Sequence, residues 1–360
     1  MDQQFSEHLR RIELSVNQFL PRQPDSEWIR LSFGNQPQEI TGSHISPLLE
    51  TTRSLVDLGG KRWRPLLLVL CARAASAEEK KEEAQETAYR LAPLVEFVHT
   101  ASLIHDDIED RSDTRRGKPA AHITYGTDTA LNAGSWLYFQ ASVCLEQLSC
   151  SAQLKNRLLC TYLSQLRRLH LGQAMDIAWH RDSTVFPSSA EYSAMIANKT
   201  GTLASLAAEI ALIICGADEQ SVLRAGQAAC EIGSGFQILD DVLNLTAGNP
   251  GKNRGDDIVE GKKSLPVLIF TEQHKNSAEQ KLLCSYFEQA AQEGIKSRAV
   301  EKAIELLGQD GCIETAREKG TALIENGCAS FMELFGKDCA DAQHIRDLCA
   351  SLIPENGSRA

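Results

Sequence analysis

Apolar residues recur at helical spacing along almost the whole chain. The first such stripe consists of Phe5, Leu9, Ile12, Val16 and Leu20, which follow one another at intervals of three or four residues. This is the spacing at which side chains share one face of an α-helix. Alternation with a period of two, rich in Val, Ile and Thr, is nearly absent. The pattern therefore predicts an all-α protein.

Turn-forming residues divide this pattern into segments. The prolines that follow Leu20 end the first helix, and the polar stretch 21–43 is expected to be a loop. Gly59-Gly60 ends the next helix, and Pro65 suits the first turn of another. The further helices are expected over residues 45–56, 65–75, 83–110, 127–149, 152–180, 189–214, 219–245, 264–273, 278–292, 297–307, 311–333 and 338–352.

No linker rich in Pro, Gly or Ser separates two halves of the chain, so residues 1–360 are expected to form one domain. Within it we distinguish an N-terminal helix and loop (1–44), a catalytic bundle (45–350) and a tail (351–360). The longest apolar helices can be covered only by rings of other helices. We therefore expect a single large helical bundle around a deep central cavity.

The composition adds a negative net charge and unpaired cysteines. The chain has 37 Lys and Arg against 48 Asp and Glu, a net charge of −11, which disfavours nucleic acid and anionic membranes as partners. Eleven scattered cysteines without a CxxC pair indicate buried free thiols in a reducing compartment. No secretory leader and no membrane-spanning apolar run is recognised, so a cytoplasmic location without an integral membrane segment is expected.

An acidic cluster ends one of the most apolar helices. Asp106 and Asp110 are spaced i and i+4, so both carboxylates point from the same face. Their repulsion costs a few tenths of a kcal/mol, and the helix macrodipole disfavours anions there by roughly 0.3 to 1 kcal/mol more. Folding alone would not favour this arrangement, whereas Mg²⁺ binds one or two carboxylates in this way. A solvated helix end is the alternative for one such motif taken alone.

A second acidic cluster changes that balance. Asp240 and Asp241 also follow an apolar helix, with Asn244 four residues after Asp240. Two such clusters facing each other across a bundle would form a multi-metal clamp for a polyphosphate. Basic runs near both clusters suit phosphate groups, although any single run is more often solvated surface. These runs are Gly60-Lys61-Arg62-Trp63-Arg64-Pro65, Arg115-Arg116-Gly117-Lys118 and Glu260-Gly261-Lys262-Lys263.

Taken together, these motifs resemble those of the trans-isoprenyl diphosphate synthases, also called polyprenyl synthetases. The resemblance covers about residues 55 to 270, in the family's order, and in texture it is closest to geranylgeranyl diphosphate synthases. It rests on Gly60-Lys61-Arg62-Trp63-Arg64-Pro65, on His99 to Asp110 with Arg115-Arg116-Gly117, on Gly172-Gln173-Ala174-Met175-Asp176, on Lys199-Thr200-Gly201, on Phe236 to Asp241, and on Gly255 to Lys262.

The resemblance implies an all-α isoprenoid synthase fold, a homodimer, and a prenyltransferase of isoprenoid biosynthesis that uses about three Mg²⁺ ions. Its substrates would be isopentenyl diphosphate and an allylic diphosphate, and its products a longer trans-polyprenyl diphosphate and pyrophosphate. The implied metal residues are Asp106, Asp107, Asp110, Asp240 and Asp241, of which Asp107 and Asp241 play supporting parts.

The remaining implied roles concern the two substrates. Arg115, Lys199 and Lys262 would hold the allylic diphosphate. Isopentenyl diphosphate would be held by Lys61, Arg64, His99, Arg116 and the backbone at Gly60. Thr200 and Gln237 would lie beside the allylic carbon, so the catalytic set is Asp106, Lys199, Thr200, Gln237 and Asp240.

Product length in this family depends on the depth of an apolar pocket below the first motif. Ala101 and Ser102 would face that pocket one helical turn before Asp106, with Val98 two turns below. These small or modest side chains indicate a product of twenty carbons or more. Trp136, Tyr138 and Phe139 are the alternative, lower floor.

Several alternatives remain open at the level of sequence. A class I terpene cyclase shares the first motif, but this chain has Gly248 where the second cyclase motif needs Glu. The pair His105-Asp106 could belong to a metal phosphohydrolase, but the remaining pattern fits one poorly. His105 is expected to be a packed residue and not a catalytic base. A regulatory subunit of a hetero-oligomeric synthase is the non-enzymatic alternative. Asn244 replaces an aspartate that is common in the family, and its effect is open.

Overall fold

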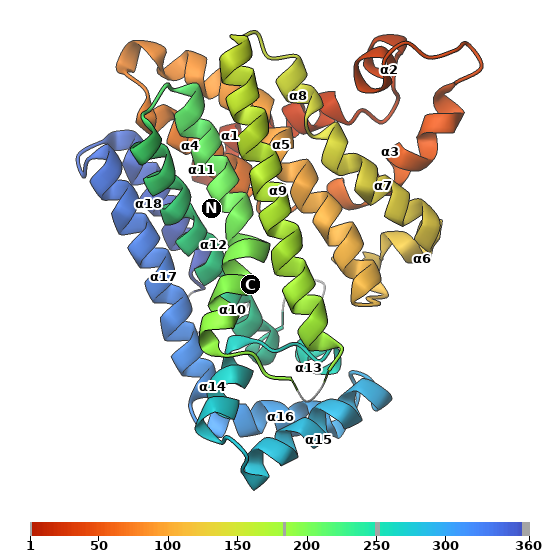
Figure 1. Cartoon of the computed structure of the whole chain (residues 1–360), viewed down its shortest axis with the longest axis vertical. Helices are drawn as coiled ribbons and strands as arrows, with labels where there is room; N and C mark the ends of the chain where they lie inside the picture. The colour runs from red at the N-terminus through yellow and green to blue at the C-terminus, as the bar shows by residue number, and fades with distance from the viewer. Residues whose placement is uncertain (1, 183–184, 249–252, 355–360) are drawn as a thin grey trace. The chain divides into compact units, whose positions relative to one another are not determined.

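A computed structural model describes residues 2–182, 185–248 and 253–354 of the chain (Figure 1). Almost all of these residues lie in helices. The only strands within the described ranges are β1 (Thr114–Arg115) and β2 (Lys118–Pro119), which form one antiparallel pair. The prediction of an all-α protein is confirmed.

Backbone contacts divide the chain into two compact units. Unit 1 comprises residues 1–164, 206–226 and 331–348, and unit 2 comprises residues 165–205, 227–330 and 349–360. Helices α9, α11, α12, α17 and α18 contribute residues to both units. That residues 1–360 act as one domain, and that a central cavity is present, stay predictions.

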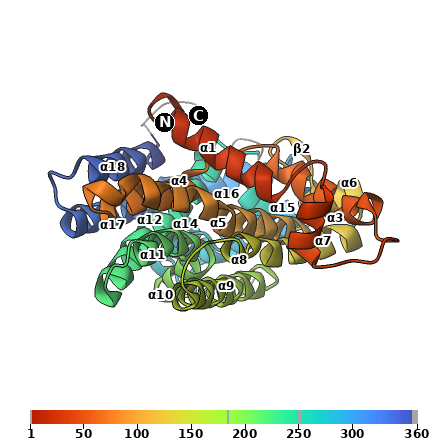
Figure 2. The ribbon, with the colours of Figure 1, turned by 90° about the horizontal axis from the view of Figure 1, so that it is seen from above.

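Unit 1 is organised around α5, in whose middle turns every residue from Leu91 to Val98 is buried. Leu91, Leu94 and Ile104 of α5 are fully buried. Helix α5 packs against α3, α4 and α7, and α1 lies across α4 and α5 (Figure 2). The helices of this part of the chain are α1 (Asp2–Phe19), α2 (Ser26–Phe33), α3 (Gly42–Val56), α4 (Trp63–Ala75), the 3₁₀-helix η1 (Glu78–Lys80), α5 (Lys81–Glu109), α6 (Ala121–Tyr125), α7 (Thr127–Gln140), α8 (Val143–Glu146) and α9 (Ala152–His180).

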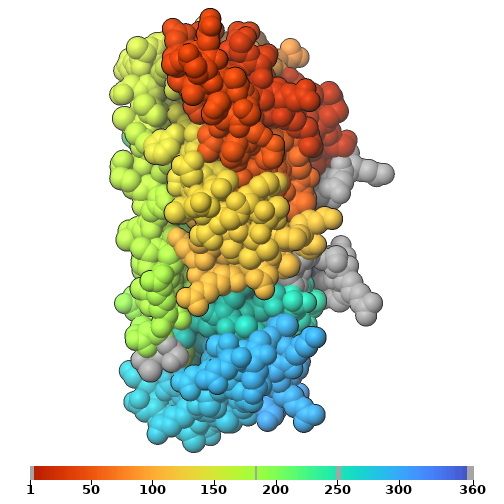
Figure 3. All heavy atoms as spheres, turned by 90° about the vertical axis from the view of Figure 1, so that its right-hand side faces the viewer, coloured from red at the N-terminus to blue at the C-terminus, as the bar shows by residue number. Residues whose placement is uncertain are grey.

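Unit 2 has a core in which Val242, Leu245, Val267 and Phe270 are inaccessible to solvent. Its helices α15 and α16 pack together and form the exposed block of blue atoms in Figure 3. The remaining elements are α10 (Ser189–Ile196), the π-helix η2 (Ala197–Gly201), α11 (Thr202–Ile214), α12 (Glu219–Thr246), α13 (Asp256–Val259), α14 (Leu265–Gln273), α15 (Ala278–Glu293), α16 (Arg298–Gln309), α17 (Cys312–Phe335) and α18 (Ala340–Leu352).

Helix α2 lies inside the stretch that was expected to be a loop, so that prediction was wrong. Asp25 caps the helix by accepting a hydrogen bond from the backbone N–H of Trp28 at 2.7 Å. The indole of Trp28 is buried and donates to the carbonyl of Phe19 at 3.1 Å. Because prolines precede it, this short helix was not predicted from the sequence. The burial of Trp28 stabilises it.

The helix expected over 127–149 is interrupted, because α7 ends at Gln140 and the one-turn α8 follows. The hydroxyl of Ser142 donates to the carbonyl of Phe139 at 2.8 Å, which satisfies a carbonyl at the end of α7. The short helices α6 and α13 were also missed, since a single turn is too short to show a period. Helix α9, in contrast, has the predicted bounds.

Candidate functional site

The first acidic cluster lies at the end of α5 in unit 1. Asp106 and Asp110 are one turn apart there, at the negative end of the helix dipole. Asp107 is buried and accepts a hydrogen bond from Arg115 Nε at 2.7 Å, with a second contact from the Nη2 atom of the same guanidinium. Asp107 therefore orients Arg115, and its role toward a metal stays a prediction.

The residues Arg115-Arg116-Gly117-Lys118 form the turn of the small hairpin β1–β2, which the sequence analysis missed. Arg115 and Lys118 are paired across it, and the two residues between them have positive φ, 50° for Arg116 and 74° for Gly117. Two central residues of positive φ are what a tight hairpin of type I′ requires. The hairpin fixes the backbone from which both arginines extend.

The loop before α4 lies against this hairpin. A side chain at Gly60 would place its Cβ 3.0 Å from Arg116 Nη2, a tight approach that would require the guanidinium to shift by a few tenths of an ångström. Gly60 also has a φ of 151°, which other residues rarely adopt. The guanidinium of Arg64, in the first turn of α4, lies 4.5 Å above the ring of Trp63. The predicted isopentenyl diphosphate residues Gly60 and Arg116 are therefore in contact.

His99 of α5 is surrounded by positive charge. Burial, and then Arg64, Arg116, Arg62 and Arg115, hold the pKa of His99 well below its ordinary value. The imidazole is therefore neutral at pH 7. Burial also lowers the pKa of Arg116. A concentration of cations this dense in a protein of net charge −11 is the arrangement expected of an anion site.

The residues proposed for chain length lie on the same helix. Ala101 and Val98 are fully buried, and the hydroxyl of Ser102 donates to the carbonyl of His99 at 2.8 Å. Of the aromatic residues considered as a lower floor, Phe139 is 75% exposed, so it does not line a buried pocket. His105 packs beside the ring of Tyr138, with ring centroids 5.5 Å apart, as expected for a packed residue.

The second acidic cluster, at the end of α12 in unit 2, is held by a chain of hydrogen bonds. Thr200 Oγ1 donates to Gln237 Oε1 at 2.9 Å, and Gln237 Nε2 donates to Asp241 Oδ1 at 2.9 Å. The hydroxyl of the buried Tyr192 donates to Asp241 Oδ2 at 3.0 Å. Both carboxylate oxygens of Asp241 are thus engaged, and three predicted site residues form one connected network.

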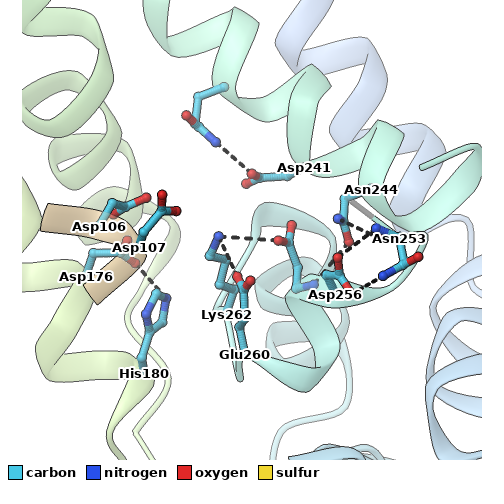
Figure 4. A network of polar contacts seen from close by, with 12 residues as sticks. Asp106, Asp107, Asp176, His180, Asp241, Asn244, Asn253, Asp256, Glu260 and Lys262 are labelled. Carbon is cyan, nitrogen blue, oxygen red and sulfur yellow. Dashed lines mark hydrogen bonds and ion pairs between the residues drawn. The ribbon is translucent and has the colours of Figure 1, made fainter. Parts of the chain in front are cut away.

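Acidic groups crowd around Asp241. Burial, and then the carboxylates of Asp257 and Asp240, raise the pKa of Asp241 to about 7, although Gln237 and Lys262 act against them. The ammonium of Lys262 lies 2.8 Å from Glu260 Oε2 and 3.4 Å from Asp257 Oδ1 (Figure 4). Lys262 therefore offsets part of this negative charge, and a further cation would offset more.

Asn244, where the family often has aspartate, is a structural tie. Its side chain is fully buried, its Oδ1 accepts from the backbone N–H of Asp257 at 3.2 Å, and its Nδ2 is 3.5 Å from the carbonyl of Asn253 (Figure 4). Its own carbonyl accepts from Gly255 at 2.9 Å. An amide can accept and donate in this way, whereas an ionised carboxylate cannot donate.

Lys199 and Thr200 lie in the π-helix η2, an element that is often found at functional sites. Gly172 of α9 is needed beside it, because a Cβ there would come within 2.2 Å of the Lys199 backbone nitrogen. Lys199 Nζ is 2.5 Å from Asp176 Oδ2. On the other carboxylate oxygen, His180 Nε2 is 2.9 Å from Asp176 Oδ1, the contact drawn in Figure 4. Burial would raise the pKa of Asp176, but Lys199 and His180 together hold it well below its usual range.

Three residues around the predicted site residues were given no predicted function from the sequence. They are Asp176 and His180, beside Lys199, and Tyr192, beside Asp241. The i and i+4 spacing of Asp176 and His180 was a usable signal, because it places them on one face of α9. No local pattern pointed to Tyr192, whose partner Asp241 is 49 residues away.

The acidic residues have the chemistry of ligands for a divalent cation. No cluster of three or more His, Cys, Asp or Glu side chains in the described ranges could enclose an ion by itself. Mg²⁺ typically takes one or two protein carboxylates and completes its shell with phosphate oxygens and water. The carboxylates at Asp106 and Asp110, and at Asp240 and Asp241, provide hard oxygen donors of this kind.

The comparison with known proteins decides the family. The sequence model described as polyprenyl synthetase matches residues 46–306. The chain belongs to the polyprenyl synthetase family. Members of this family depend on a divalent cation and use allylic and isopentenyl diphosphates as substrates. The chain is thus a trans-isoprenyl diphosphate synthase, a prenyltransferase, as predicted.

Individual relatives support the same assignment. The chain is 32% identical over 292 residues to a geranylfarnesyl diphosphate synthase of Natronomonas pharaonis, a match that covers 78% of this chain and 82% of that protein. It is 33% identical over 293 residues to a geranylgeranyl pyrophosphate synthase of Geoglobus acetivorans, covering 77% and 82%.

Among solved structures, the geranylgeranyl pyrophosphate synthetase of Pyrococcus horikoshii superimposes with a TM-score of 0.78 at 28% identity. The match covers 98% of this chain and 100% of that one. In the described parts of this polyprenyl synthetase, no helix combines the length and apolar character that a membrane span needs.

The role of Asn244 gives a stability prediction. Asn244→Asp removes the amide donor and buries a further carboxylate in a segment that already carries Asp241 and Asp257, so we expect a loss of about 2 to 4 kcal/mol of unfolding free energy. Urea unfolding followed by circular dichroism measures this loss. The matched control is Asn156→Asp, an exposed position of α9, which should shift the curve by less than about 0.5 kcal/mol. Identical curves for both variants would contradict the structural role.

The neutral His99 gives a pH prediction. Because its pKa is lowered in the folded state, the unfolded chain binds more protons, and stability is lost as the pH falls below about 6.5. The loss approaches about 1.4 kcal/mol for each pH unit. His99→Gln removes this contribution, so the wild type should lose stability relative to the variant between pH 7.5 and 5.5. A constant difference across that range would show that His99 titrates normally.

Proposed function

We propose that the chain is a Mg²⁺-dependent synthase that condenses an allylic diphosphate with isopentenyl diphosphate to a trans-polyprenyl diphosphate of twenty carbons or more, releasing pyrophosphate. One observation carries the proposal beyond family membership. Four arginines concentrate positive charge around a neutral His99, on the helix that ends in the Asp106 cluster. Such a charge concentration suits a diphosphate, whereas an apolar or neutral substrate would not offset its cost.

The cations of unit 1 are assigned to isopentenyl diphosphate. Lys61, Arg64 and Arg116 would bind its phosphate oxygens. Because Gly60 has no side chain, the diphosphate could approach the backbone closely at that position. His99 is neutral, so it can donate one hydrogen bond to the diphosphate without adding to the repulsion among the arginines.

The acidic clusters are assigned to about three Mg²⁺ ions. Asp106 and Asp110 would hold two ions and Asp240 the third, with Asp107 and Asp241 in supporting roles. When bound, Mg²⁺ neutralises charge on the leaving diphosphate. Three cationic residues, each already oriented by an acidic neighbour in the structure, would hold the allylic diphosphate. They are Arg115, Lys199 and Lys262.

The reaction then depends on position and electrostatics. The alkene of isopentenyl diphosphate attacks the allylic carbon as the bond to the diphosphate oxygen breaks. The side-chain oxygens of Thr200 and Gln237 would stabilise the positive charge that develops on that carbon, and their mutual hydrogen bond fixes their orientation. The released pyrophosphate takes up the proton that the product loses, so no side-chain base is required.

A product of twenty carbons or more is supported by the side chains below Asp106. Ala101 is buried and has the smallest side chain after glycine, and Ser102 and Val98 are also small or modest. The two relatives described above are named for geranylgeranyl and geranylfarnesyl products, which have twenty and twenty-five carbons. The preferred primer stays open.

We also propose a homodimer in a reducing cytoplasm. Leu131 and Phe139 of α7 are 50% and 75% exposed, an apolar surface that suits a partner subunit, and α6 and α7 are the yellow surface in Figure 3. All eleven cysteines lie in the described ranges, and none of them forms a disulfide there.

Elongation with radiolabelled isopentenyl diphosphate tests the proposed function directly. The protein, Mg²⁺ and geranyl or farnesyl diphosphate should give a labelled product of twenty carbons or more. Asp106→Asn should lower turnover by about 100-fold or more, because it removes a metal ligand. Asp113→Asn, an exposed position beyond the cluster, is the control. No elongation with any primer would refute the proposal.

Product length tests the pocket separately. Ala101→Phe should shorten the main product by at least one five-carbon unit, because the added ring fills the space below Asp106. Chromatography of the dephosphorylated products measures the chain length. Ala92→Phe, two turns further from the motif on the same buried helix, controls for the disturbance of α5 packing. An unchanged product from a stable Ala101→Phe protein would mean that position 101 does not form the floor.

A further inference from the structure

Arg62 is the residue immediately before α4, and its backbone is unusual. Its φ is 47° and its ψ 25°, the left-handed conformation that residues with a side chain rarely adopt. The side chain itself is only 3% exposed. A strained backbone and a buried charge at one position persist only where the surroundings hold them.

Three partners hold the guanidinium of Arg62. Its Nε donates to Glu13 Oε1 at 2.7 Å, its Nη1 to Glu96 Oε1, and its Nη2 to the carbonyl of Val56 at 2.8 Å. These partners belong to α1, α5 and the C-terminal end of α3, so one side chain joins three helices to the start of α4. Each nitrogen has a different acceptor, a pattern that the arginine fork allows and lysine does not.

Arg62 stands between the two cations assigned to isopentenyl diphosphate. Lys61 precedes it, and Arg64 follows two residues later in the first turn of α4. With the φ of Arg62 fixed, the backbone directions of Lys61 and Arg64 are fixed relative to α5, which carries His99. Gly60, on the other side of Lys61, is in turn held against Arg116.

We propose that Arg62 is a positioning residue, and that Glu13 of the N-terminal helix α1 holds it so that Lys61 and Arg64 are set for isopentenyl diphosphate. This rests on the proposed function of that loop. It also gives a role to α1, which lies across α4 and α5 (Figure 2). Glu13 can be changed with little structural risk, since its side chain is 41% exposed, whereas Glu96 is buried.

The second anchor of α1 separates this role from general attachment of the helix. Asn17, one turn after Glu13, accepts from Arg53 Nη1 at 2.8 Å, and the same Nη1 donates to the carbonyl of Leu20 at 2.7 Å. Helix α1 therefore stays tied to α3 when Glu13 is removed. A loss of affinity for isopentenyl diphosphate in Glu13 variants is then due to the lost contact with Arg62.

The test measures the dissociation constant of isopentenyl diphosphate by calorimetry, without the second substrate, for the full chain. Glu13→Ala should weaken binding about five- to tenfold, and Glu13→Gln by less, because its amide oxygen can still accept from Arg62. Glu7→Ala is the matched control, since Glu7 is on the same helix and pairs within it with Arg10. In the elongation assay, the KM for isopentenyl diphosphate should rise while the KM for the allylic diphosphate and kcat stay within twofold.

The binding measurements can refute the positioning role of Arg62 separately from the proposed synthase activity. Equal affinities for Glu13→Ala and Glu7→Ala would overturn it, as would equal losses for both substrates together with a lower melting temperature. No binding of isopentenyl diphosphate to the wild type would overturn it too. A wild type that binds isopentenyl diphosphate but does not elongate would refute the synthase while leaving the positioning role intact if Glu13→Ala weakens binding.

A glycine variant separates backbone conformation from side-chain contacts. Arg62→Gly adopts a φ of 47° without strain but makes none of the three contacts. If the contacts position the loop, its affinity for isopentenyl diphosphate should fall at least as far as that of Glu13→Ala. Wild-type affinity in Arg62→Gly would overturn the proposal, and if that variant does not fold, Glu13→Ala decides alone.

Discussion

Repulsion between like charges is the constraint on which this structure depends most. In unit 1, burial and then the charges of Arg64, Arg116, Arg62 and Arg115 lower the pKa of His99 and keep the imidazole neutral. Holding four guanidinium groups together in a partly buried place is unfavourable unless carboxylates or a bound anion offset the charge. The chain supplies three of those carboxylates itself, Glu13 and Glu96 to Arg62 and Asp107 to Arg115. The rest of the positive charge is what a diphosphate would neutralise.

In unit 2 the repulsion is between negative charges. Burial, and then the carboxylates of Asp257 and Asp240, raise the pKa of Asp241 to about 7, and Lys262 offsets only part of this negative charge. Hydrogen bonds from Tyr192 and Gln237 orient Asp241, while Asn244 holds the segment that carries Asp257. Neutral side chains thus hold these carboxylates in place although the carboxylates repel one another. A bound cation would relieve that repulsion without a rearrangement of the site.

Much of this could be predicted from the sequence where the signal is local. The apolar period gave the bounds of α9 and most of α12, and the i and i+4 spacing of Asp106 and Asp110 placed them on one face. Helix α2 was missed because its stability comes from the burial of Trp28, not from its own pattern. The π-helix around Lys199 depends on the close approach of Gly172, and the network of Arg62 on Glu13 and Glu96, which are 49 and 34 residues away. Contacts of that sequence separation leave no periodic trace.

The proposed difference between the two units is that the arginine cluster of unit 1 would bind a diphosphate by its own charge, whereas the acidic clusters would need a divalent cation to do so. Calorimetric titration of the wild type with isopentenyl diphosphate and, separately, with a non-reactive farnesyl thiodiphosphate, each with EDTA and with Mg²⁺, tests it directly. We expect isopentenyl diphosphate to bind with similar affinity in both conditions and the allylic analogue to bind tightly only with Mg²⁺. Equal dependence of both ligands on Mg²⁺, or none for either, would contradict it.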